Sequence, residues 1–186
     1  MIYDPTGALS ERKREFETAY CPEDVWKWRM ARVLWNIWQY GDYNGISRLA
    51  RRGDGVGVLI AQGQFVESVM GLICILNKRF SLYYKWLHWQ FLQMPRWSDV
   101  FEPLLQELEA AGTHGERAHH MNMICEKVRE ALYADGILPD ADRRPRMGAW
   151  DLLRTIRSEN VRRLIMGLDP VLAGEQRRWR TDRPRG

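Results

Sequence analysis

Hydrophobic residues recur every three or four positions along most of the chain, which is the period of an α-helix. The clearest stripe, within residues 117–133, consists of Met121, Ile124, Cys125, Val128 and Leu132. No segment shows a convincing two-residue alternation of the kind that marks a half-buried strand. The pattern therefore predicts an all-α fold, an antiparallel bundle of about five to seven helices joined by short loops.

Helix boundaries follow from capping residues and helix-breaking residues. We expect helices over 10–19, 22–40, 46–51, 58–76, 80–93, 99–111 and 117–133, with one or two more over 150–168. The helix at 58–76 is apolar nearly all round, so we expect it in the centre of the bundle. Gly41 is expected to end the helix at 22–40, and Ser98 is expected to cap the helix at 99–111.

A polar stripe runs along the otherwise apolar helix expected at 22–40. It consists of Arg29, Arg32, Asn36 and Gln39, which are three or four residues apart and therefore share one side of the helix. Bundle cores exclude such groups unless they are paired, because burying an unpaired polar group costs about 1–3 kcal/mol. A concave site accommodates the stripe better than a core does.

Residues 76–88 combine cations with aromatic rings. Lys85 and His88 are three residues apart, and Tyr84 and His88 are four apart, so these side chains share one helical face. Fixed cations beside stackable rings suit contacts with phosphates and with bases or sugars. The alternative is an ordinary amphipathic helix, with its rings in the core and its cations in solvent. Our candidate substrate-binding residues are Tyr84, Lys85, His88, Arg29, Arg32 and Asn36.

Glu67 is the one acidic residue in the helix expected at 58–76. Gly63 and Gly71, four residues to either side, leave little side-chain bulk around it. A carboxylate in such a setting can act as a general base with a raised pKa, or it can pair with an arginine. Glu67 is therefore our candidate catalytic residue, with the structural alternative left open.

The basic excess of the chain lies in its last residues. The chain has 28 basic and 24 acidic residues, and residues 175–186 hold five of the former and two of the latter, which leaves 23 against 22. We expect residues 1–170 to form the bundle and residues 171–186 to form a basic, flexible tail. Because the body is nearly neutral, nucleic-acid binding is not expected except through the arginine-rich tail.

Cysteine usage and hydropathy favour a cytoplasmic protein without membrane association. The three cysteines are far apart, odd in number and without a Cys-x-x-Cys pair. The chain does not open with the pattern of a signal peptide. The single apolar stretch of membrane length, 56–76, carries Gln62, Gln64 and Glu67 near its middle, where polar groups are costly in lipid. No metal site is expected, since Glu116 and His120 have helical ligand spacing but nothing completes the set.

Several short blocks resemble a bacterial family of unknown-function domains. They lie at 20–25, 39–44, 48, 51–54, 76–80 and 83–88, and the Tyr-Tyr-Lys-Trp block within 83–88 is the most specific. The resemblance extends from about residue 2 to residue 168. In that family a helical domain follows a minimal nucleotidyltransferase domain, and it is similar to the C-terminal helical domain of kanamycin nucleotidyltransferase.

The resemblance implies an acceptor-binding helical domain that works with a nucleotidyltransferase catalytic domain, in cis or in trans. Nucleotidyltransferases of this class hold an NTP through a Gly-Ser motif and bind Mg²⁺ through an Asp-x-Asp pair. Residues 140–142 have the letters of that pair, but they lie in a loop without a strand or a Gly-Ser partner. We therefore expect no cofactor in this chain, with Mg²⁺ and NTP bound by the catalytic domain.

Two hypotheses for the function remain open. In the first, the chain binds a nucleotide or a small-molecule acceptor for nucleotidyl transfer and is inactive alone. In the second, it is a stand-alone helical interaction module that partners a minimal nucleotidyltransferase, as in toxin–antitoxin pairs.

Overall fold

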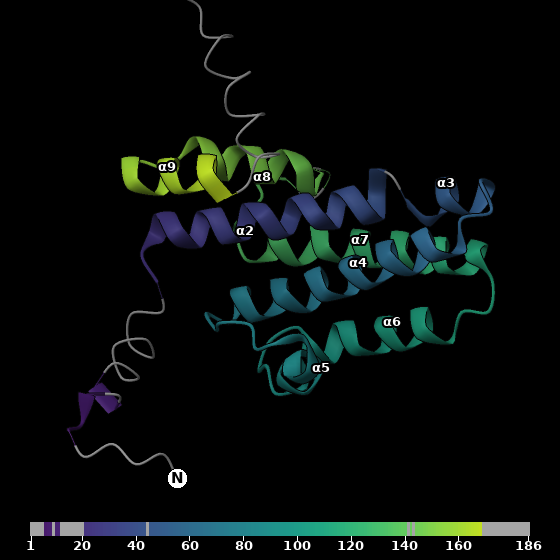
Figure 1. Cartoon of the computed structure of the whole chain (residues 1–186), viewed down its shortest axis with the longest axis horizontal. Helices are drawn as coiled ribbons and strands as arrows, with labels where there is room; N and C mark the ends of the chain where they lie inside the picture. Colours follow the sequence, from purple (N-terminus) through teal and green to yellow (C-terminus); the bar gives the residue numbers. More distant parts are fainter. Residues whose placement is uncertain are drawn as a thin grey trace, which may run out of the picture.

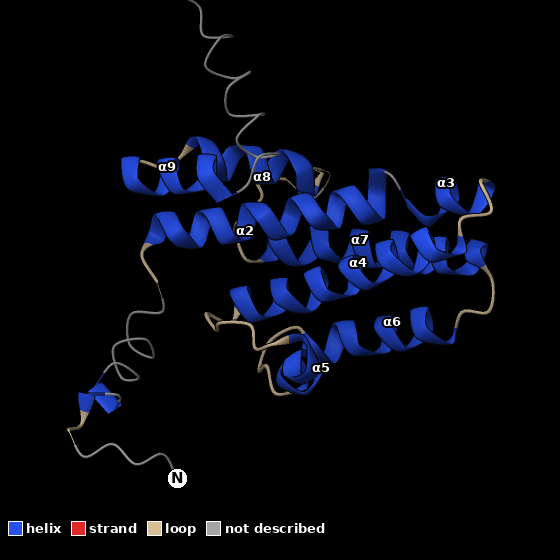
Figure 2. Ribbon diagram, viewed as in Figure 1, coloured by secondary structure: helices blue, strands red, loops and turns tan. Residues whose placement is uncertain are grey.

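The computed structural model describes residues 6–8, 10–11, 21–43, 45–140, 142 and 144–168. None of these residues forms a strand, which confirms the predicted all-α fold (Figure 2). In chain order the elements are α2 (Glu23–Ile37), the π-helical η1 (Trp38–Tyr43), α3 (Gly45–Arg51), α4 (Gly55–Leu76), α5 (Tyr84–Leu92), α6 (Ser98–Ala110), α7 (His114–Ala134), α8 (Pro145–Arg154) and α9 (Glu159–Leu168). Most of the helix expected at 10–19, and the whole of the tail at 171–186, lie outside the described residues.

Helices α2 and α4 lie side by side and run in opposite directions (Figure 1). Helix α8 packs along the other side of α2, while α7 packs against α3, η1 and α6. One continuous core joins these elements, and its largest fully buried side chains include Phe65, Phe91, Phe101 and Met30. The bundle is therefore held together by helices distant in sequence, not by neighbouring helices alone.

Helix α4 supplies much of the core. Every residue from 68 to 76 is buried, as expected for a central helix. By length and composition it is also the one described helix that could cross a membrane, but 61% of its apolar window is buried within the bundle. It begins at Gly55, three residues before the expected start, because the Asp54 side chain accepts the N–H of Gly57 at 2.8 Å and caps the first turn.

The expectation that Gly41 ends a helix is wrong. The chain continues from α2 into η1, and Gly41 lies buried within that π-helical segment. A β-carbon at this position would lie 2.5 Å from Cε2 of Phe65 and 2.7 Å from Sγ of Cys125. The glycine is thus required for close packing between η1 and its neighbours, and not for a helix stop.

The helix expected over 80–93 begins only at Tyr84. Gln90 prevents an earlier start, because its amide nitrogen donates to the carbonyl of Phe80 at 2.8 Å and its amide oxygen accepts the N–H of Leu82 at 2.8 Å. These two bonds hold the preceding segment extended against the side of α5. The sequence pattern does not contain this information, because the partner of each backbone group is a side chain eight or ten residues away.

Asn77 fixes the other end of the same segment. Its amide nitrogen donates to the carbonyls of Ile73, at 2.8 Å, and Arg96, at 3.0 Å, and its amide oxygen accepts the N–H of Arg96 at 3.2 Å. Lys78 follows with a φ of 54°, in the left-handed region. The chain therefore turns sharply out of α4 and is tied to the start of the α6 region.

Two helix starts differ from their expected form. Ser98 does not cap α6; its hydroxyl donates to the carbonyl of Met94 at 2.5 Å, and Trp97 takes the cap position. Helix α7 starts three residues earlier than expected, at a capping box of Thr113 and Glu116. The N–H and hydroxyl of Thr113, together with the N–H of Gly112, lower the pKa of the Glu116 carboxyl.

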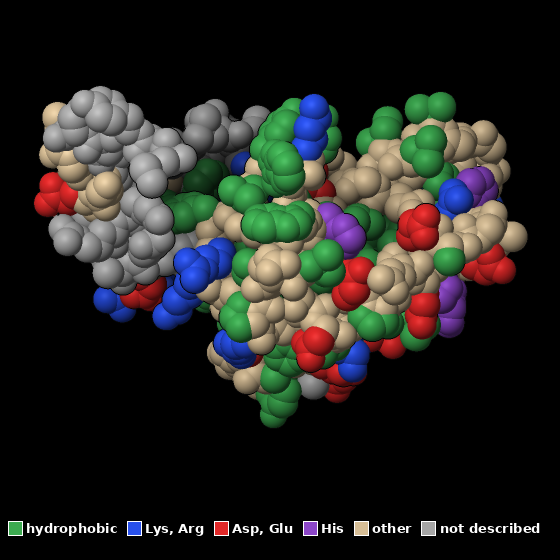
Figure 3. Space-filling model, turned by 90° about the horizontal axis from the view of Figure 1, so that it is seen from below, with side chains coloured by type: hydrophobic (Ala, Val, Ile, Leu, Met, Phe, Trp, Pro, Cys, Tyr) green, Lys and Arg blue, Asp and Glu red, His purple; other side chains and the backbone are tan. Residues whose placement is uncertain are grey.

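Large apolar side chains are left uncovered around α5. Figure 3 looks onto the face of the molecule formed by α5 and α6, where hydrophobic side chains gather in the centre of the view. The exposed residues include Tyr83, Tyr84, Trp86 and Trp89. Of the residues in α5, Leu87 and Phe91 are the ones buried in the core.

Asp24 joins the start of α2 to the start of α9. Its Oδ2 accepts the N–H of Ser158 at 2.6 Å and that of Arg157 at 3.0 Å. The hydrogen bond from Ser158, opposed by partial desolvation and supported by the bond from Arg157, holds the pKa of Asp24 below its ordinary value. The ionised carboxylate is therefore the form that stabilises this junction.

We predict that Gly41→Ala destabilises the protein by about 1–3 kcal/mol, because the new methyl group overlaps the buried Phe65 ring. Gly63→Ala is the matched control: Gly63 lies within α4, and an added β-carbon there would have no neighbouring atom within 4 Å. That change should stabilise the helix by about 0.5–1 kcal/mol. Urea denaturation of both variants measures the difference, and equal effects would contradict the packing role of Gly41.

We also predict a pH-dependent effect of Asp24→Ala. The folded pKa of Asp24 is lowered, so its contribution is fully present above the unfolded pKa of about 4 and is lost as the pH falls through the folded value. The difference in unfolding free energy from wild type should shrink between about pH 6 and about pH 2.5. Glu109→Ala, an exposed carboxylate on α6, controls for the general loss of one negative charge. A difference that is constant with pH would contradict the assignment.

Candidate functional site

Two pockets lie beside α4, the first between α4 and α2 and the second between α4, η1 and α3, and we call them together the α2–α4 groove. The first has a volume of about 380 Å³. Its lining residues come from α2, α4, the segment before α5, and α5 itself: Trp28, Arg29, Arg32, Val33, Asn36, Gln64, Glu67, Ser68, Gly71, Ile75, Ser81, Leu82 and Leu87. Its polar groups come mainly from the two long helices.

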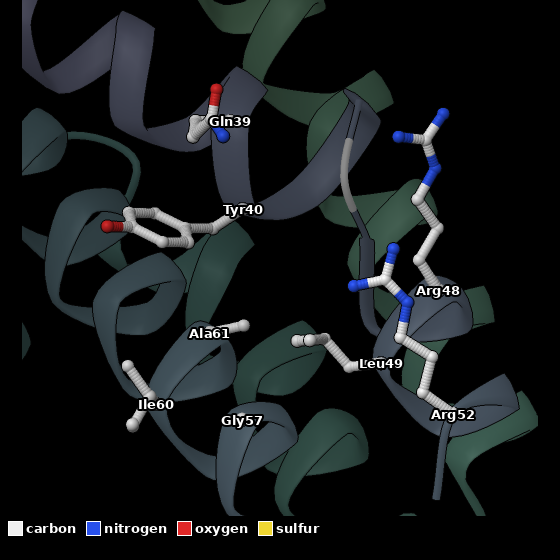
Figure 4. A pocket seen from close by; sticks show the side chains of 8 residues that line it. All are labelled: Gln39, Tyr40, Arg48, Leu49, Arg52, Gly57, Ile60 and Ala61. Atoms are coloured by element: carbon white, nitrogen blue, oxygen red, sulfur yellow. The ribbon is translucent and has the colours of Figure 1, made fainter. Parts of the chain in front are cut away.

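The second pocket, of about 430 Å³, is formed by η1, α3 and the first part of α4. It is lined by Gln39, Tyr40, Arg48, Leu49, Arg52, Gly57, Ile60 and Ala61. In Figure 4 the Arg48 and Arg52 side chains lie on one side of the pocket, and the Tyr40 ring lies on the other side and points away from them. Leu49, Ile60 and Ala61 supply the apolar part of the lining.

The polar stripe predicted on α2 lines this groove along its whole length. Arg29, Arg32 and Asn36 line the first pocket, and Gln39 lines the second. Arg29, Arg32 and Asn36 are three or four residues apart on one side of α2, and Gln39 follows three residues later in η1. The stripe is thus accounted for by a concave surface, and not by a buried polar network.

The groove carries a cationic excess. Its lining residues include the arginines Arg29, Arg32, Arg48 and Arg52 and a single carboxylate, that of Glu67. Guanidinium groups match the geometry of phosphate and carboxylate oxygens, which they bind through paired N–H donors. The lining therefore suits an anionic ligand, with Glu67 as the one acceptor of positive charge or of a proton.

Trp28 carries one of the few buried polar atoms without a partner among the described residues. Its indole Nε1 is buried and has no hydrogen-bond partner among the described residues. A buried N–H without an acceptor costs about 1–3 kcal/mol, so such groups are uncommon outside binding sites and water sites. Trp28 lines the first pocket together with Arg29 and Arg32.

Arg29 forms one end of the groove. Its guanidinium carbon lies 4.6 Å from the centre of the Phe80 ring, a cation–π contact that spans from α2 to the segment before α5. Ser81 and Leu82, the next two residues, line the pocket. The same segment is held in place by Gln90, so α5 positions this wall of the groove through a single amide side chain.

The structure separates the candidate substrate-binding residues into two sets. Arg29, Arg32 and Asn36 lie in the groove, and so does the candidate catalytic residue Glu67, which is solvent-exposed. The other three, Tyr84, Lys85 and His88, are exposed on α5 and do not line either pocket. The residue of α5 that reaches the groove is Leu87.

His88 has a partner of its own outside the groove. Its Nε2 lies 3.2 Å from Oε2 of Glu102 on α6, and its ring is stacked beside that of Phe91. The imidazole is therefore positioned by contacts between α5 and α6. A role for His88 in proton transfer within the groove would need it to leave this pair.

Three groups of the site were not predicted from the sequence. Arg48 and Arg52 were not among the candidates, although their four-residue spacing places them on one side of a short helix. The role of Gln90 could not be predicted from the sequence pattern, because it consists of hydrogen bonds to two backbone groups in a non-helical segment. The unpaired indole of Trp28 became visible only with the packing around it.

Cysteine nucleophiles and protein-held metals do not feature among the described groups. None of the three cysteines forms a disulfide, and burial raises the pKa of the Cys21 and Cys74 thiols, which keeps them protonated. In the described part of the chain, no three His, Cys, Asp or Glu side chains come together as a metal site requires. The groove's chemistry is that of binding through arginine, amide and hydroxyl groups.

The fold and the site define an all-α bundle with two arginine-lined pockets beside α4. Residues 1–87 match the model of a family described as a domain of unknown function, DUF4037. No curated protein and no solved structure matches the chain. Every residue that lines the groove lies within the matched part, between Trp28 and Leu87.

Proposed function

We propose that the chain is the acceptor-binding helical domain of a nucleotidyltransferase. In this proposal the α2–α4 groove binds an anionic ligand, either part of the nucleotide or a small-molecule acceptor that carries phosphate or carboxylate groups. A nucleotidyltransferase catalytic domain, supplied in cis or in trans, binds Mg²⁺ and the NTP and performs the transfer. Pyrophosphate is the leaving group, and the acceptor gains the nucleotidyl group.

The observation that carries the proposal is the charge of the groove. Four arginines and one carboxylate line a surface that is otherwise made of amide, hydroxyl and apolar groups. Phosphoryl-type transfer depends on positioning and on neutralising negative charge, and fixed guanidinium groups do both. The indole ring of Trp28 lies in the same pocket wall as Arg29 and Arg32.

Glu67 has a defined place in this proposal. It lines the same pocket as Arg29 and Arg32 and is exposed to solvent, so a bound acceptor could contact it directly. A carboxylate beside an acceptor hydroxyl or amine accepts the proton that the acceptor loses on transfer. The resemblance of blocks within residues 20–88 to nucleotidyltransferase-associated helical domains supports the same division of labour.

The first test uses nucleotide transfer. We predict that the purified chain alone transfers no label from α-³²P-labelled ATP with Mg²⁺, since it has no recognisable Gly-Ser cradle or metal-binding Asp-x-Asp pair. Co-expression with a nucleotidyltransferase domain encoded in frame or beside it should give a stable complex that labels an acceptor. Metal-dependent turnover by the chain alone, through successive purification steps, would contradict the proposal.

The second test uses binding to the groove. We predict that Arg32→Gln weakens the binding of ATP or pyrophosphate to the chain, measured by isothermal titration calorimetry. A hydrogen bond to a charged group contributes about 1.5–3 kcal/mol, which corresponds to about tenfold or more in affinity. Arg163→Gln on α9 is the matched control, because Arg163 is an exposed arginine outside the groove. If the two variants bound these ligands with equal affinity, the groove would not be the binding site, and this part of the proposal would be wrong.

A Glu67→Gln variant separates the two roles of the groove. The change removes the proton acceptor but keeps the shape of the side chain. In the active complex it should lower kcat more than it raises KM for the acceptor. An unchanged kcat would leave Glu67 without a catalytic role, whatever the effect of Arg32→Gln.

A further inference from the structure

The segment before α5 and the outer side of α5 expose an unusual set of aromatic rings, which we call the aromatic face. Its members are Phe80, Tyr83, Tyr84, Trp86 and Trp89. The last four are between 59% and 64% exposed. Large apolar side chains scattered singly on a surface are ordinary, but a contiguous group of this size marks an interaction site.

The periodicity of α5 explains why the rings point outward. Leu87 and Phe91 are four residues apart and take the side of the helix that faces the core. Trp86 and Trp89 are three residues apart on the other side, and Lys85 is four residues before Trp89. Tyr83 and Tyr84 lie at the beginning of the helix with ring centroids 4.4 Å apart. The rings are therefore exposed around α5, and Lys85 is exposed beside them.

The aromatic face lies in a segment of the chain with a local cationic excess. Residues 68–98 contain Lys78, Arg79, Lys85 and Arg96 and no acidic residue, a net charge equal to that of the entire chain. The remaining residues thus contain as many acidic as basic groups. The net charge of the bundle is close to zero, which argued against nucleic-acid binding. That value is an average over the chain, and residues 68–98 have a local excess of positive charge.

Three of these four cations are available for a partner. Arg96 is paired with Asp135. Lys78, Arg79 and Lys85 are exposed, and none forms an ion pair with a described residue. They flank the rings at both the start and the middle of the aromatic face. A partner that matches this surface must carry both negative charge and flat, stackable groups.

We propose that the aromatic face binds single-stranded nucleic acid. Unpaired bases stack on Trp86, Trp89 and the Tyr83–Tyr84 pair, and the intervening phosphates contact Lys78, Arg79 and Lys85. Helix α5 is nine residues long, or roughly 13 Å, which gives room for on the order of three stacked bases. This proposal does not rest on the proposed nucleotidyltransferase function, because the chain alone is expected to bind.

The charges around the rings favour this partner over a protein surface. Lysine is depleted from protein–protein interfaces, whereas here Lys85 lies one helical turn before Trp89 on the same side of α5. On the neighbouring α6, the exposed carboxylates of Asp99, Glu107 and Glu109 limit the cationic surface on one side. Double-stranded nucleic acid does not match this surface, because its bases are stacked on one another and offer no free faces to the aromatic rings.

Fluorescence anisotropy with labelled 12-nucleotide oligo(U) and oligo(dT), against a 12-base-pair duplex, tests the proposal with the full chain. Both single strands should bind more tightly than the duplex. With three phosphates neutralised, the logarithm of the affinity should fall against the logarithm of the salt concentration with a slope of about −2. Lys85→Ala should reduce that slope by about 0.7.

The decisive variant is Trp86→Ala combined with Trp89→Ala, for which we expect single-strand affinity to fall about tenfold or more. Both side chains are largely exposed, so the variant should fold, which circular dichroism and thermal unfolding verify. Tyr133→Ala is the matched control: Tyr133 is an exposed aromatic residue on α7, and its loss should leave affinity unchanged.

Three outcomes would overturn the proposal. Absence of binding to either single strand is the first. Binding that is equal for duplex and single strand, or indifferent to the double tryptophan variant, is the second; it would assign binding to the basic residues 175–186. The third is a double variant that separates the chain from a nucleotidyltransferase domain while neither protein binds the oligonucleotides, which would make the face a protein-docking surface.

Discussion

The fold depends on burying the apolar surface of α4 beneath the neighbouring helices. Residues 68–76 of this helix are buried without exception, and α2, α3, η1 and α5 all pack against it. Each large apolar side chain that is removed from water contributes about 1.5–3 kcal/mol, so the cover is strongly favoured. Toward the start of α4 the cover is incomplete, and Val56, Leu59 and Ile60 stay exposed. Of these three exposed residues, Ile60 lines the second pocket of the α2–α4 groove.

Much of the helical framework could be predicted from periodicity and capping residues. The central position of α4 and the stripe on α7 follow from side-chain spacing within one element. The errors have a different origin. Gly41 was interpreted as a helix stop because a glycine's local effect is visible in the sequence, whereas its contact with Phe65 is not. Likewise, the late start of α5 depends on Gln90, whose side chain bonds to backbone groups outside its own helix.

The same distinction between contacts within one helix and contacts between helices explains the positions of the candidate site residues. Arg29, Arg32 and Asn36 share a groove because three- and four-residue spacing within one helix is preserved in any helical fold. Their expected proximity to Lys85 required knowing how α5 is rotated against α2, and the burial of Leu87 and Phe91 turns Lys85 away. Relations within a helix can thus be inferred from spacing, whereas relations between helices depend on which apolar residues meet in the core.

The packing of α8 along α2 bears on where this protein can be divided. Trp35 lies edge-to-face against Trp150 with ring centroids 6.2 Å apart, and the Arg146 guanidinium carbon lies 4.6 Å from the centre of the Trp38 ring. The part that matches the family ends at residue 87, so it contains one side of this contact and lacks the other. A fragment cut at that boundary would keep every residue of the groove but leave the tryptophan-rich back of α2 in water. The unit that matches by sequence and the cooperative unit of folding therefore have different lengths in this chain.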